Sequence, residues 1–171
     1  LYDYLRLLFA RAGQTFCHLC GREVKKDSPE SAADEVLATL PESTRFYVLF
    51  PVQEHLEPVK AIKGKSKSKS SGRQSMSTGA FLLLLLQQGF SRLFRNGETI
   101  ELNQPEDYKF DDFNDTYVLI DRLAATPDTR QRLVDSLEVC FREAHSAVIQ
   151  SVDEQQLKYS DSYICKYDGT R

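Results

Sequence analysis

The chain has 171 residues, 41% of them apolar and 27% charged, a size and composition that fit one domain with appendages and exclude two ordinary domains. Its longest apolar run, Phe81 to Leu86, is far shorter than the roughly 20 residues of a membrane span, and no leader pattern opens the chain. The net charge of −3 conceals a stretch from Pro58 to Gly97 that has eight basic residues and no acid. We therefore expect a cytoplasmic protein with no membrane segment and one strongly basic region.

The N-terminal third predicts two helices. Leu1, Leu5, Leu8, Phe9 and Ala12 share one helical face that Gly13 ends. This pattern starts at Leu1 without an initiator methionine, so we expect an excerpt from a longer protein. A second helix is predicted from Ser28-Pro29-Glu30, a cap followed by proline at the first helical position, up to Pro41.

Between these helices stands Cys17-His18-Leu19-Cys20, which forms one half of a zinc knuckle. The other half is sought at Cys165-Lys-Tyr-Asp168, where a carboxylate stands in the place of a second thiolate. Cys17 and Cys20 are the candidate metal ligands, and zinc is the candidate cofactor. Free thiols in a surface turn are the alternative.

The middle of the chain predicts a central strand, a loop and a helix. Arg45 to Phe50 is apolar after its first residue and suits a strand covered on both faces. The lysine-serine stretch inside residues 57–78 has no apolar residues to bury, so we expect a mobile basic loop that attracts phosphates or acidic protein surfaces, or else a solvated connector. Thr78 to Gly89 predicts a buried helix.

The last third predicts a hairpin, strands and a long helix. Asn96-Gly97 is the pair best suited to a two-residue hairpin turn. Tyr117 to Ile120 predicts a strand, and Thr126-Pro127-Asp128 predicts the capped start of a helix whose inner face includes Leu133, Leu137 and Phe141. Ala147–Val152 and Leu157–Ile164 predict two more strands. The fold class is mixed α+β: a twisted mixed sheet with helices packed on it.

No phosphate-binding loop, Gly-x-Gly-x-x-Gly turn or His-Glu-x-x-His pair occurs in the chain. A cysteine-histidine nucleophile pair would need Cys17 or Cys140, and Cys140 falls on an apolar helix face. We therefore expect no catalysis by this fragment.

Several segments carry a family resemblance. They are Leu1-Tyr-Asp-Tyr-Leu-Arg-Leu-Leu-Phe-Ala-Arg-Ala-Gly13, Cys17-x-x-Cys20-Gly-Arg, Leu40-Pro-Glu-Ser-Thr-Arg45, Gln88-Gly-Phe90 before Asn96-Gly97-Glu98, Ile120-Asp-Arg-Leu123 and Arg132-Leu-Val-Asp-Ser-Leu-Glu138. In this order they resemble the UvrA family of the ABC excinuclease, the damage-sensing ATPases of bacterial nucleotide excision repair, over practically the whole chain.

The resemblance implies an insert in the first half of an ABC-type ATPase. Residues 1–27 would belong to that ATPase half, residues 28–152 would form the domain that docks UvrB, the helicase-like partner, and residues 153–171 would return to the ATPase. ATP, magnesium, DNA binding and a homodimer would be properties of the parent. Two segments depart from the family: Cys165-Lys-Tyr-Asp168 replaces a second cysteine pair, and a longer lysine-serine loop with a leucine-rich helix replaces a short basic loop and a charged helix.

Docking is expected to use complementary charges, which set encounter rate and register. On the long helix, Asp135 and Glu138 match the family's acids, and Arg130 and Arg132 lie near its start; a solvated face with a Glu138–Arg142 pair is the alternative. A second, basic surface would include Lys60, Lys63, Arg92 and Arg95. It could instead grip the DNA backbone. A purely structural insertion is the third possibility.

Overall fold

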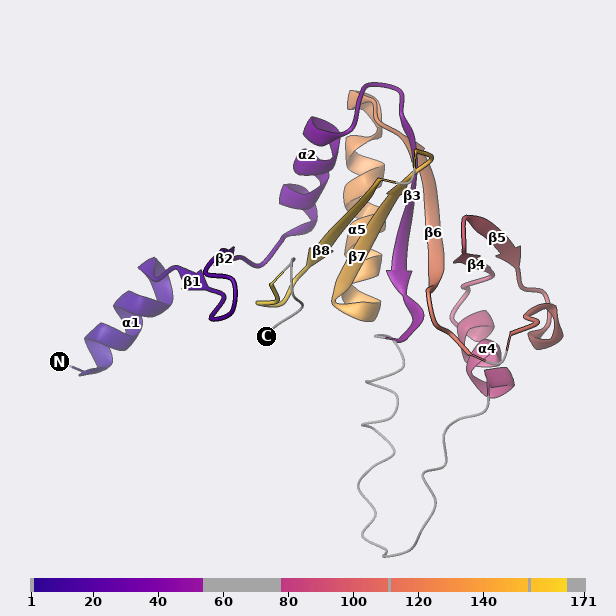
Figure 1. The fold of residues 1–171 in the computed structure, drawn as a ribbon, viewed down its shortest axis with the longest axis horizontal. Coiled ribbons are helices and arrows are strands. Elements are labelled where there is room, and N and C mark those ends of the chain that lie inside the picture. Colours follow the sequence, from indigo (N-terminus) through magenta and orange to yellow (C-terminus); the bar gives the residue numbers. More distant parts are fainter. Residues whose placement is uncertain (1, 54–77, 111, 154, 166–171) are drawn as a thin grey trace, which may run out of the picture.

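The computed structural model describes residues 2–53, 78–110, 112–153 and 155–165 (Figure 1). The centre of the fold is a six-stranded sheet in the order β5-β4-β6-β3-β7-β8, in which every neighbouring pair is antiparallel. The strands are β3 (Arg45–Pro51), β4 (Arg92–Arg95), β5 (Glu98–Glu101), β6 (Thr116–Ala124), β7 (Ser146–Ser151) and β8 (Gln156–Ser160). The α+β class is confirmed, but the sheet is antiparallel throughout rather than mixed.

Two helices cover one face of this sheet (Figure 1). They are α2 (Pro29–Thr39) and α5 (Arg130–Ala144), which lie side by side. Ser28 caps α2 through a reciprocal pair of hydrogen bonds with Ser31, as the Ser-Pro start predicts. Helix α5 packs on β3, whose Phe46, Val48 and Phe50 are fully buried, and α2 packs against α5 in the same core. Strand β3 is therefore central, as its continuous apolar run predicts.

Helix α4 (Thr78–Gln87) joins the same core at the β4–β5 end of the sheet. Phe81, Leu82 and Leu85 are buried, whereas Leu83 is 49% exposed, so the helix is only half-buried. The hairpin of β4 and β5 turns at Asn96 and Gly97, which take φ angles of 50° and 84°. These positive values are those of the predicted two-residue turn.

The start of α5 differs from the prediction. Pro127–Thr129 forms a 3₁₀ turn, η2, and α5 begins only at Arg130. Thr126 makes no side-chain capping bond; the Thr129 hydroxyl donates 2.8 Å bonds to the carbonyl oxygens of Ala124 and Thr126 instead. The hydroxyl that fixes this corner is therefore three residues later than expected.

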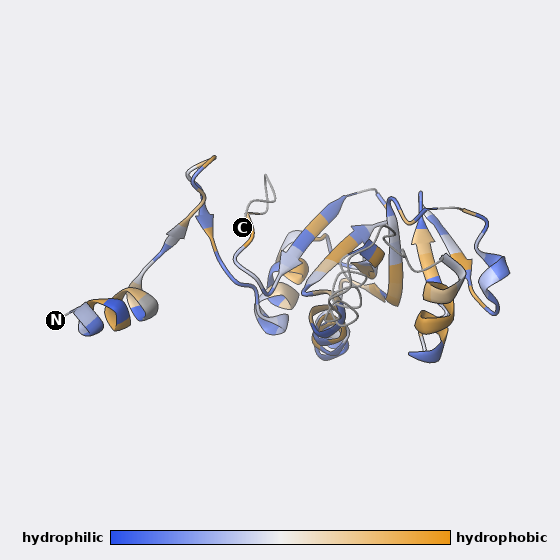
Figure 2. Ribbon diagram, turned by 90° about the horizontal axis from the view of Figure 1, so that it is seen from below, coloured by the Kyte–Doolittle hydropathy of each residue, from blue (hydrophilic) through white to orange (hydrophobic). Residues whose placement is uncertain are grey.

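The N-terminal region stands apart from the sheet in two views (Figures 1 and 2). It contains α1 (Tyr2–Ala12) and a ribbon of β1 (Thr15–Phe16) with β2 (Glu23–Val24). Helix α1 carries several exposed apolar residues; Tyr4 is 77% exposed and Phe9 is 71% exposed. No helix in the described ranges has the length and hydropathy that crossing a bilayer requires.

The face of the sheet opposite α2 and α5 carries a small second cluster. Leu49, Phe94, Leu119 and Val148 are buried there, with Tyr47 and Tyr117 packed against them. No described helix contributes to this cluster.

Candidate functional site

The outer surface of α5 carries the predicted acids. Asp135 and Glu138 are both exposed, and the Gln131 side chain donates a 2.9 Å hydrogen bond to Asp135. Arg142 pairs with Glu143 at 3.0 Å. Among the described residues, Arg142 thus pairs with Glu143 and not with Glu138.

Two arginines flank these acids, and the guanidinium group of each forms a bidentate ion pair with a carboxylate. Arg130 binds Asp34 of α2 at 2.7 and 3.0 Å, and its hydrogen bond lowers the pKa of the Asp34 carboxyl. Arg132 binds Asp121 of β6 at 2.6 and 2.7 Å, and this bond raises the pKa of Arg132. The structure thus brings together Arg130, Arg132, Asp135 and Glu138 as one charged surface, which we call the α5 surface.

The predicted basic surface is not assembled in the same way. Lys60 and Lys63, with the rest of the loop expected at 57–78 up to Ser77, lie outside the described residues. Arg92 is exposed on the face of the sheet opposite α5, because Phe94 of the second cluster shares its side of β4. Arg92 and the α5 surface therefore lie on opposite sides of the molecule.

Arg95 is committed to contacts within the domain. Its Nη1 donates to the Tyr108 hydroxyl at 2.9 Å and to the Asp112 carbonyl oxygen at 3.0 Å. Its Nη2 lies 3.0 Å from the Asp112 carboxylate, and the guanidinium sits 4.1 Å from the Phe110 ring centroid. With a side chain only 14% exposed, Arg95 supports the hairpin rather than extending from it.

Three thiols lie close together, two from the turn between β1 and β2 and one from the segment after β8. The ligand atoms of Cys17, Cys20 and Cys165 lie within 4.8 Å of one another, and the Sγ atoms of Cys20 and Cys165 are 3.5 Å apart. The turn that presents the first two is built by the Gly21 amide, which donates to the Cys17 carbonyl at 2.8 Å while Gly21 takes a φ of 69°. Asp168, the carboxylate that stands in the place of a second thiolate, lies outside the described residues.

This thiol cluster has the chemistry and size of a zinc site. Thiolate sulfurs about 2.3 Å from a tetrahedral zinc ion lie roughly 3.8 Å from each other. Soft sulfur ligands favour zinc over magnesium or calcium. The residues present therefore fit the ion.

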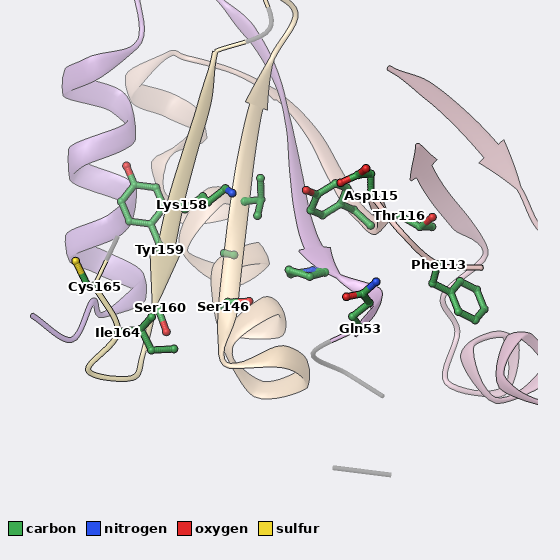
Figure 3. Close-up of a pocket in the computed structure, with 14 residues that line it drawn as sticks. Gln53, Phe113, Asp115, Thr116, Ser146, Lys158, Tyr159, Ser160, Ile164 and Cys165 are labelled. Atoms are coloured by element: carbon green, nitrogen blue, oxygen red, sulfur yellow. The ribbon is translucent and has the colours of Figure 1, made fainter. Parts of the chain in front are cut away.

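A hollow of about 390 Å³ lies at one end of the sheet face opposite α5 (Figure 3). Its lining includes Gln53, Tyr117, Val148 and Lys158. The sequence did not predict this site because its residues come from separate strands. The alternation of outward-facing side chains along β6 to β8 is the signal that could have grouped them.

Comparison with known proteins gives consistent matches. A family model described as the UvrA interaction domain matches residues 72–154. The UvrABC system protein A of Streptomyces avermitilis is 34% identical and that of Synechocystis is 35% identical, the matches covering 98% and 94% of this chain. The protein of the same name from Clostridium tetani is 32% identical over 96% of the chain. The chain spans 15–16% of the length of these relatives.

Proposed function

This chain belongs to the UvrA family and includes its interaction domain, and from that premise we propose that residues 28–152 dock UvrB through complementary charges. In the parent protein, this docking would bring UvrB to damaged DNA. The observation that carries the proposal is the α5 surface, where Asp135 and Glu138 are exposed between two arginines held in fixed positions.

The geometry of the α5 surface supports docking rather than simple solubility. The ion pairs of Arg130 with Asp34 and of Arg132 with Asp121 hold the flanking guanidinium groups in place before any partner arrives. Less side-chain entropy is then lost on binding. Asp135 and Glu138 leave carboxylate oxygens facing solvent, so a basic patch on UvrB would complement them.

Calorimetric titration of the full chain with UvrB of the same organism, at low and moderate salt, tests the proposal. We expect binding that weakens with salt and is lost in the double variant Asp135→Lys, Glu138→Lys. The matched control is Glu98→Lys, Glu106→Lys, which makes the same charge change at exposed acids away from α5.

The control separates a local contact from general electrostatics. If both double variants lose binding equally, net charge and not the α5 surface is responsible. If the chain binds duplex DNA but not UvrB, the alternative function stands, in which the basic loop with Lys60 and Lys63 grips the DNA backbone.

We also propose that Cys17, Cys20 and Cys165 hold a structural zinc ion. Zinc would supply a cross-link between the N-terminal turn and the segment after β8. Metal analysis should find one ion per chain, and cobalt substitution should give the absorption of a tetrahedral thiolate site. Cys165→Ser should lose the ion, whereas Cys140→Ala, which removes a thiol buried in the main core, should keep it. Retention of the metal by the Cys165 variant would refute the assignment.

A further inference from the structure

The sheet face opposite α2 and α5, here called the open face, is a surface that the proposed docking does not use. Strand register assigns its residues, since those paired with Tyr47, Leu49 and Val148 must point the same way. The open face is therefore formed by Arg45, Tyr47, Leu49, Pro51, Arg92, Phe94, Thr99, Glu101, Tyr117, Leu119, Arg122, Ala124, Ser146, Val148, Gln150, Gln156, Lys158 and Ser160.

The open face is basic. Arg45, Arg92, Arg122 and Lys158 lie on it and are exposed, and among its described residues Glu101 is the one acid. The helix layer behind it has the opposite balance, with more acids than bases along α2 and α5. A chain with a net charge of −3 thus gathers positive charge on one side of its sheet, where polyanions are attracted.

Aromatic rings lie among these cations. The Tyr47 ring packs against Phe94 with centroids 5.0 Å apart, and the Arg122 guanidinium lies 5.7 Å from the Tyr47 centroid. The Thr99 hydroxyl accepts a 2.8 Å hydrogen bond from Arg122 and fixes its position. Tyr117, also half-buried, extends the aromatic surface toward the hollow.

The hollow gives this face a bounded site. Its 390 Å³ is within the range of small-ligand pockets. Tyr117 lines it together with Lys158, which Figure 3 labels. Gln53, Ser146 and the carboxylate of Asp115 add polar groups at its wall, and the Gln53 amide is already oriented by a 3.0 Å bond to Asn114. A planar heterocycle of the size of one base fits such a volume.

We propose that the open face binds a short single strand of nucleic acid, with its phosphates on Arg122, Arg92 and Lys158 and its bases against Tyr47 and Tyr117. Cations interleaved with aromatic rings on an antiparallel sheet are the features that hold unpaired bases. A six-stranded sheet is wider than the roughly 12 Å major groove of an undistorted duplex, which admits a helix or a two-stranded ribbon, and this argues against double-stranded DNA. An acidic protein segment would match the charge but leave the rings and the hollow unexplained.

Fluorescence anisotropy of the full chain with labelled oligothymidylate over a range of salt concentrations tests this proposal. We expect Arg122→Ala, Lys158→Ala to weaken binding and to reduce the slope of log K against log salt by about 1.4, about 0.7 for each lost phosphate contact. Arg142→Ala, Lys25→Ala removes two exposed cations elsewhere and should bind as the parent chain does.

Ultraviolet cross-linking followed by mass spectrometry supplies the location. Cross-links to the peptides that contain Tyr47 or Tyr117 are expected, and Tyr117→Leu, which keeps an apolar side chain, should lower the yield. Both cation variants change exposed side chains, so circular dichroism should show them folded.

Three results would overturn the proposal. One is unchanged binding in the open-face variant together with loss in Lys63→Ala, Lys65→Ala, which would assign binding to the loop. Another is tighter binding of duplex than of single strand. The third is displacement of the labelled oligothymidylate by polyglutamate as readily as by unlabelled oligothymidylate, which would indicate a protein partner. Titration with UvrB should be unaffected by the open-face variant, so the two proposals can fail independently.

Discussion

At the scale of single residues, Tyr108 is the centre of a buried polar group. Its hydroxyl donates to the Asp112 carbonyl oxygen, lies 3.0 Å from the Thr116 hydroxyl and accepts from Arg95. Tyr108→Phe would remove these hydrogen bonds, but Arg95 would still donate to the Asp112 carbonyl oxygen and Thr116 to that of Asn114, so we expect a loss of about 0.5–1.5 kcal/mol in the free energy of unfolding. Urea denaturation measures it. Tyr163→Phe, at a 57% exposed tyrosine, is the control and should change little.

Asp107 gives a prediction on pH. Its carboxylate accepts bonds of 2.8 and 2.9 Å from the backbone amides of Asn103 and Gln104, and these bonds lower the pKa of Asp107. A lowered folded-state pKa adds stability above the unfolded value near 3.9, and this stability is lost as the pH falls through the folded value.

Asp107→Asn should therefore reduce the urea midpoint at pH 7, with a gap to the parent chain that closes below about pH 4. Midpoints measured between pH 7 and pH 2.5 test this. Asp128→Asn, at an exposed acid in η2, removes one negative charge elsewhere in the chain and is the control. If the difference in urea midpoint between the Asp107 variant and the parent chain stays constant with pH, the charge of the carboxylate does not account for the stability that it adds.

At the scale of elements, we predict opposite effects on stability for the same glycine-to-alanine substitution at two positions. Gly97 needs its φ of 84° for the β4–β5 turn, and no atom would meet an added Cβ, so Gly97→Ala should destabilise by about 1 kcal/mol through the backbone alone. Gly79 lies in α4, where an added Cβ would stand 4.0 Å from Pro105. Gly79→Ala should stabilise by up to about 1 kcal/mol. Thermal unfolding of both variants decides, and the same sign for both would contradict the argument.

The strands show what the sequence can and cannot predict. The β4–β5 hairpin followed from Asn96-Gly97, because turn chemistry is local. Strand β6 runs to Ala124, whereas the predicted strand ends at Ile120. The prediction ended too early because Asp121 and Arg122 interrupt the apolar pattern. In the folded chain Asp121 pairs with Arg132, and Arg122 lies against the Tyr47 ring. Such partners, and the antiparallel pairing of every strand, are properties of the folded chain.

The candidate site shows the same division. Asp135 and Glu138 were predicted on one exposed face because helical spacing alone fixes it. The internal role of Arg95 was not foreseen, because it depends on Tyr108 and Asp112 folding back over the hairpin. For the thiols, spacing identified Cys17 and Cys20 and the sequence offered Cys165 as part of the other half, whereas the distances among the three required the fold.

At the scale of the whole molecule, the thiol cluster holds together two segments from opposite ends of the described chain. If zinc occupies it, removal of the metal should loosen only this region, since the six-stranded sheet has its own core. Hydrogen exchange before and after chelation should show lost protection in β1, β2 and residues 161–165, with β3, β6 and β7 unchanged. Global loss of protection would mean that the cluster supports the entire fold.

The order of strands in the sheet also has a consequence for how fast the chain folds. The central pair, β3 and β6, joins Leu49 to Leu119, whereas the hairpins β4–β5 and β7–β8 close over short loops. Contacts between residues distant in sequence raise the contact order and slow the search for the native state. The hairpins can form early, but the core is complete only when the most distant strands meet, so refolding should be slow for a chain of this length.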